Sequence, residues 1–85
     1  MLMASLSSLF KAGPGGVMTD EVGVVTGDLE LCTELSEDGK LIARVRYEGA
    51  EEWYAITGAA CALADPRDHE PVHSLLLGLL NRPEG

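Results

Sequence analysis

The chain has 85 residues, of which 46% are hydrophobic, and its formal net charge is −8. A chain of this length forms one small domain with a modest core, so self-association is a reasonable way for it to gain stability. The negative charge disfavours nucleic acid and anionic lipid as partners, and no apolar run approaches the ~20 residues that a membrane-spanning helix needs.

The first twenty residues differ in character from the rest of the chain. Four apolar residues recur there at helical spacing, with serines between them: Leu2, Leu6, Leu9 and Phe10. Lys11 follows this apolar part instead of preceding it, which makes a poor secretory signal. Residues 12–16 combine glycine with proline, as linkers do. We predict a flexible or helical arm with a Gly/Pro linker over residues 1–20, and a single α+β domain over residues 21–85.

Residues 22–57 predict four short antiparallel strands. Gly27-Asp28, with glycine first, is typical of a type II′ hairpin turn between the first two strands. For the next turn we prefer a three-residue loop with a left-handed Gly39 over a two-residue turn. That loop pairs apolar or small residues on one face of the sheet: Leu35 with Leu41, Thr33 with Ala43, Leu31 with Val45, and Leu29 with Tyr47. A slip of one residue would spoil this face.

The last turn of the meander leaves two registers open. A four-residue loop near Gly49 would pair Tyr47 with Tyr54, and Val45 with Ile56. A loop of odd length would instead turn Trp53 toward the inner face.

The second face of the sheet carries opposite charges and one tryptophan. The preferred register sets Glu30 opposite Arg46 and Cys32 opposite Arg44, with Glu34 diagonal to Arg44. Two interpretations remain for this face. It is a solvated surface with ion pairs, or it is a binding surface centred on Trp53, with an arginine in cation–π contact.

The segment after the fourth strand is rich in alanine. Residues 59–64 favour a short helix, and Asp65-Pro66 then stops or redirects the chain. Cys32 and Cys61 are too few for a disulfide scaffold, so we expect reduced thiols in a cytoplasmic protein.

Residues 69–73 match the H-E-x-x-H pattern of zinc metalloproteases. That chemistry needs both histidines one turn apart on a regular helix, with the glutamate beside the metal-bound water. Pro71 is tolerated only in a first turn, which places His69 at or before the helix start. We therefore expect a polar helix entrance here, and neither a catalytic zinc site nor another cofactor.

The helix over residues 71–81 is the clearest local prediction. Five apolar residues follow the spacing of one helical face: Val72, Leu75, Leu76, Leu79 and Leu80. This face should cover the apolar side of the sheet, and Pro83 should end the helix. His73 and Leu77 fall on its shoulder, where a second subunit or the N-terminal arm could pack.

The predicted fold class is therefore α+β, a four-stranded antiparallel meander covered on one face by a C-terminal helix. We expect a non-catalytic protein-interaction module, most simply a homodimer, and no nucleic-acid or membrane partner. The alternative is an inhibitor or immunity-type protein that presents acidic residues to a basic protein target. Two surfaces supply the candidate interface residues: Trp53, Arg44 and Arg46 on the sheet, and His73 and Leu77 on the helix.

Overall fold

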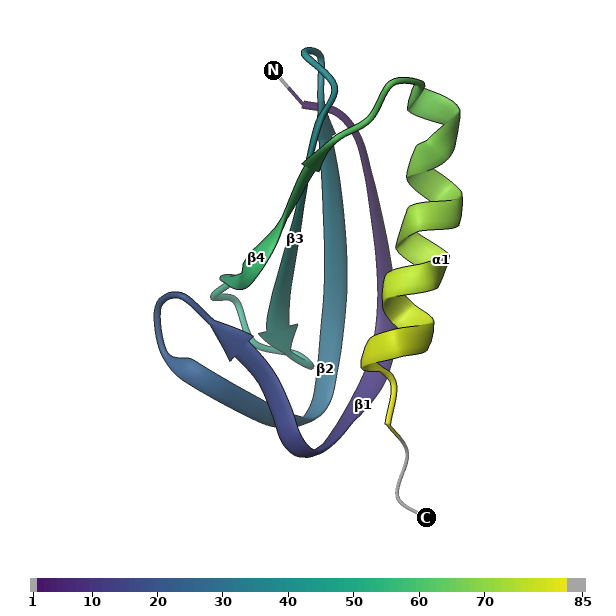
Figure 1. Ribbon diagram of the computed structural model, residues 1–85. Coiled ribbons are helices and arrows are strands. Elements are labelled where there is room, and N and C mark those ends of the chain that lie inside the picture. Colours follow the sequence, from purple (N-terminus) through teal and green to yellow (C-terminus); the bar gives the residue numbers. More distant parts are fainter. Residues whose placement is uncertain (1, 83–85) are drawn as a thin grey trace.

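The computed structural model describes residues 2–82. Its elements follow one another along the chain: β1 (Leu2–Thr19), β2 (Gly23–Ser36), β3 (Lys40–Tyr47), β4 (Tyr54–Ala62), a 3-10 turn (Pro66–Asp68) and α1 (His69–Leu80). Figure 1 shows the strands as an antiparallel meander, with α1 packed along one side of it. The predicted fold class is confirmed.

The prediction of a flexible or helical arm is wrong, because residues 2–19 form β1. This strand pairs with β2 in a regular register from Ala4, opposite Leu35, to Ala12, opposite Gly27. The register then shifts before Val17, so the glycines and proline of the expected linker form a bulge inside the strand. Burial explains the outcome, since Phe10 and other apolar residues of β1 belong to the core.

The first turn also differs from the prediction. β2 runs through Gly27 and Asp28, and Gly27 has φ of +94°, so it supports a local distortion of the strand and not a chain reversal. The reversal lies at residues 20–22. There the Thr19 hydroxyl donates to the carbonyl of Gly23 at 2.6 Å and accepts from the amide of Val22 at 3.2 Å.

The predicted register of β2 and β3 is confirmed at every pair, from Leu35 opposite Leu41 to Leu29 opposite Tyr47. Gly39 has φ of +84°, and its amide donates to the carbonyl of Ser36 at 3.0 Å. The apolar pattern and the turn glycine agree on one register, which is why this part was predictable.

The pairing of β3 with β4 differs from both registers predicted for the last turn of the meander. Val45 lies opposite Tyr54, two residues away from the partner that a four-residue loop would give it. An irregularity follows between Ile42 and Arg44, and β4 then continues to Ala62 where a helix was expected. Pairing with β3 overrides the helix propensity of alanine here.

The strand ladder closes on itself where β1 meets β4. Thr19 pairs with Ile56, and the amide of Asp20 donates to the carbonyl of Ala55 at 3.0 Å. The core lies inside this curved sheet. Its buried apolar residues are Phe10, Ala12, Val17, Val25, Leu29, Leu31, Leu35, Leu41, Ala43 and Val45.

Helix α1 begins at His69, two residues earlier than predicted, and Pro71 lies in its first turn, where amides have no intrahelical partner. Its inner face also differs from the predicted one. His69 and His73 are buried, whereas Leu75 and Leu79 are 62% and 59% exposed. Three leucines pack against the core, and all are partly buried: Leu76, Leu77 and Leu80.

The helix ends at Leu80, and Pro83, which was predicted to end it, lies outside the described residues. Within residues 2–82, no helix has the length and apolar character needed to cross a membrane.

Candidate functional site

A chain of polar side chains joins β1, β2 and α1, and all of its members except the partly buried Ser8 are buried. Thr33 Oγ1 lies 2.9 Å from Nε2 of His69 and 2.7 Å from Nδ1 of His73. On its other side, His73 Nε2 lies 2.9 Å from Oγ of Ser8. Thr33 is fully buried, and both imidazoles are nearly so. We call these four residues the histidine cluster: Ser8, Thr33, His69 and His73.

The hydrogen bonds of the cluster can run in either of two orders. Thr33 has a single hydroxyl proton, so it donates to one imidazole and accepts from the other. In one order His69 donates to Thr33, Thr33 to His73, and His73 to Ser8; the other order reverses every bond. Both orders keep the two imidazoles neutral. Burial lowers the pKa of His73, and the neighbouring His69 lowers it further, which also favours the neutral form.

Ser8 and His73 make the contact that a serine nucleophile makes with its base. The third position, however, is held by the neutral hydroxyl of Thr33, which gives an imidazolium none of the charge stabilisation that a carboxylate supplies. His73 is only 6% exposed, so its ring offers little surface to solvent. The cluster therefore joins three elements and does not resemble a working catalytic set.

The histidines of the H-E-x-x-H match lie one turn apart on α1, yet both rings converge on Thr33. Glu70 between them is exposed. Among residues 2–82, no group of three or more His, Cys, Asp or Glu side chains is placed to hold a metal ion. The prediction of a polar helix entrance is wrong in one respect, because His69 and His73 are both buried.

The outer face of the sheet carries the other predicted residues. Arg46 Nε donates to Glu30 Oε1 at 2.7 Å, and its guanidinium carbon lies 4.4 Å from the centre of a Trp53 ring. Arg44 Nε lies 3.2 Å from Glu34 Oε1, although the angle is not that of a hydrogen bond. Both predicted ion pairs and the predicted cation–π contact are present.

The two ion pairs contribute little to the stability of the fold. Both ion pairs are partly exposed, and pairs of this kind contribute about 0–1 kcal/mol. Their arrangement does place Trp53 and an arginine together on a solvent-facing surface. β1 adds Leu9 to the same face, since Leu9 pairs with Glu30, and Leu9 is 60% exposed.

The remaining candidate residues do not join this surface. His73 is bound within the histidine cluster, and Leu77 packs against the core. The prediction of an interface on their helix shoulder is therefore wrong for His73, whose ring faces β1 and β2. A signal for the cluster exists in the sequence: Thr33 and Ser8 are polar residues at inward-facing strand positions, and two histidines are spaced one helical turn apart.

The two cysteines are free and lie apart on the sheet, Cys32 on β2 and Cys61 on β4. Burial raises the pKa of the Cys32 thiol, and the charges of Glu34 and Glu30 raise it further, against a hydrogen bond to Ser7 that lowers it. A thiol held in its protonated form is a poor nucleophile.

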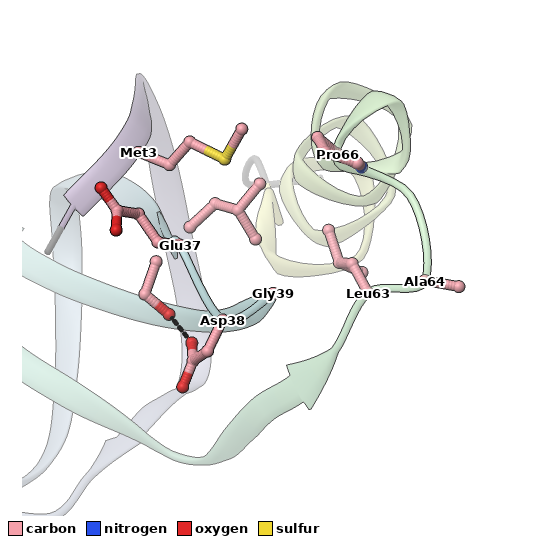
Figure 2. Close-up of a pocket in the computed structure, with 9 residues that line it drawn as sticks. Met3, Glu37, Asp38, Gly39, Leu63, Ala64 and Pro66 are labelled. Atoms are coloured by element: carbon pink, nitrogen blue, oxygen red, sulfur yellow. Dashed lines mark hydrogen bonds between the residues drawn. The ribbon is translucent and has the colours of Figure 1, made fainter.

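A cavity of about 250 Å³ lies between the β2–β3 turn and the segment after β4. Its walls include the apolar side chains of Met3, Leu35 and Leu63 (Figure 2). The carboxylate of Asp38 is occupied by the Ser36 hydroxyl and by the amide of Lys40, which lower the pKa of Asp38. Figure 2 shows Glu37 and Asp38 pointing in different directions, so this cavity lacks a converging pair of acids.

A comparison of the chain with protein-family models, curated proteins and solved structures found no match.

Proposed function

We propose that this protein is a small non-catalytic interaction module that assembles as a homodimer. The observation that supports this most directly is the exposure of large apolar side chains. Within residues 2–82, nine of them are exposed by 43–62%: Leu2, Met3, Leu9, Met18, Val22, Val24, Tyr47, Leu75 and Leu79. Single exposed leucines are ordinary, but nine large side chains in a chain of 85 residues leave apolar area that a second copy would bury.

The positions of four acidic loop residues favour this proposal over the acidic inhibitor. Glu37 and Asp38 lie in the turn before β3, and Glu51 and Glu52 lie in the loop after it. β3 has eight residues, so these two acidic groups are separated by about 26 Å at ~3.3 Å per residue. Figure 1 shows the two connections at opposite ends of the sheet. These four residues therefore do not form a single acidic surface.

Two further features fit the proposal. The most enzyme-like contact, between Ser8 and His73, is held in a buried cluster. The free thiols of Cys32 and Cys61 suit a reducing compartment such as the cytoplasm.

Sedimentation equilibrium of the full chain over a wide concentration range tests the proposal. We expect twice the chain mass at high concentration, with a reversible decrease on dilution. A chain that sediments as a monomer at every concentration would show that the exposed apolar residues do not mediate self-association.

A further inference from the structure

The outer edge of β1 has no partner strand over half of its length, although α1 packs against β1 as well. β1 pairs with β2 on one side, and on its other side it meets β4 only near Thr19. The backbone of Lys11 shows which residues face this open edge. Its amide donates to Oδ1 of Asn81 at 3.0 Å, and its carbonyl accepts from the amide of Arg82 at 2.7 Å. Both groups of Lys11 therefore point away from β2.

The strand is regular from Ala4 to Ala12, so every second residue before Lys11 has the same orientation. These residues are Leu9, Ser7 and Ser5, and all three are exposed. The partner strand agrees with this assignment, because Asp28, opposite Lys11, turns its carbonyl the other way to accept from the amide of Glu48 at 3.0 Å. Within residues 2–82, the three residues have no backbone hydrogen bond across the open edge.

An open edge of this kind is a template for another strand, and proteins usually block it with charge, proline or a bulge. Residues 1–10 contain no charged side chain and no proline, although the whole chain carries a net charge of −8. Two copies that approach through this segment therefore avoid the like-charge repulsion that other surfaces would impose. A basic or acidic partner would find no complementary charge there.

We propose that two copies of the chain pair through the β1 edges, antiparallel, with a two-fold axis at Ser7. The edge residues Ser5, Ser7 and Leu9 are centred on Ser7, and Lys11 is already occupied at one end. Pairing about this centre joins Ser7 to Ser7 of the second copy and Ser5 to its Leu9, and it joins the two sheets into one. This assignment rests on the proposed homodimer and names its contact.

The test uses Ser7→Pro in the full chain. Proline removes the amide that points to the open edge and leaves the amides that bond to β2, so the fold should persist while the edge is blocked. Ser7→Ala keeps the amide and serves as the matched control. In sedimentation equilibrium we expect the wild type and Ser7→Ala to be dimers, and Ser7→Pro to sediment with half their mass and an unchanged far-UV spectrum.

The outcomes separate this assignment from the proposed function. If Ser7→Pro folds and remains a dimer, the β1 contact is wrong and the homodimer stands. If the wild type is a monomer, both are wrong. If Ser7→Pro does not fold, amide hydrogen exchange of the wild type decides: protection of the Ser5, Ser7 and Leu9 amides that is lost on dilution supports the contact, and rapid exchange at every concentration overturns it.

Discussion

Thr33 Oγ1 lies 2.7 Å from Nδ1 of His73, although 40 positions separate the two residues and both are buried. A lone threonine or a lone histidine at either position would leave a buried polar group without a partner, which is costly. Together they satisfy each other and link β2 to α1.

Thr33→Val should therefore destabilise the fold. Valine keeps the shape but removes the hydroxyl, so His73 Nδ1 and His69 Nε2 both lose their partner. We expect the free energy of unfolding to fall by about 1–3 kcal/mol in urea titrations. Thr26→Val, on an exposed position of the same strand, is the control and should change it by less than about 0.5 kcal/mol. Equal effects would contradict a structural role for the cluster.

Stability should decrease as the pH falls below neutrality. Burial and the neighbouring His69 lower the pKa of His73 in the folded chain, so the unfolded chain takes up this proton first. The contribution of His73 is complete above the pKa of the unfolded imidazole, about 6.5, and is lost as the pH falls from there toward the lower folded-state pKa. Unfolding free energies between about pH 7.5 and pH 5.5 measure this slope. His73→Gln should flatten the slope, and a slope that the substitution leaves unchanged would exclude His73 as its source.

Leu31 and Leu75 should respond differently to truncation. Leu31 is fully buried, and Leu31→Ala should cost about 2–5 kcal/mol. Leu75 is 62% exposed, and Leu75→Ala should cost less than about 0.5 kcal/mol in the monomer. Leu76, which is partly buried, should fall between them. Denaturant midpoints of the three variants provide the ranking, and a large loss at Leu75 would mean that the helix is rotated relative to the structure.

Protein purified without added metal should not contain equimolar zinc. His69 and His73 both direct a ring nitrogen at Thr33 instead of leaving it free for a metal ion. Elemental analysis of the purified chain is the measurement. Stoichiometric zinc that disappears in His73→Ala would contradict this prediction.

Trp53→Ala should lower the free energy of unfolding only slightly. Its ring covers the guanidinium of Arg46, and a cation–π contact at an exposed site contributes about 0.5–1 kcal/mol. If β1 forms the dimer contact, this variant should remain a dimer. Monomers from Trp53→Ala would move the contact from the β1 edge to the outer sheet face.

The sequence predicts the central hairpin well because two independent signals coincide there. The alternation that places Leu31 and Val45 on one face, and the positive φ that Gly39 supplies, allow a single register. On the outer face, the same register brings Arg46 to Glu30 without further assumptions.

Other elements were missed where long-range pairing decides between two local options. The apolar residues of β1 suit a helix or a strand, and only pairing with β2 selects the strand. Residues 59–64 favour a helix in isolation, but Ala60, Cys61 and Ala62 pair with β3. The inner face of α1 was misjudged because His69 was assigned to a polar helix entrance and His73 to the helix shoulder. Thr33 and Ser8 instead supply their polar partners, from 36 to 65 positions away.

The bonds that attach α1 to the sheet also bear on the speed of folding. Ser8 and His73 are 65 positions apart, and Lys11 and Asn81 are 70 apart. Contacts between such distant positions require large loops to close before they give any stabilisation, which slows folding. The docking of α1 therefore depends on β1 and β2 already being paired, since each of the strands supplies one hydroxyl to the same imidazole. Until that step is complete, the row of core leucines on β2 faces water, and this interval is when the chain is most exposed to aggregation.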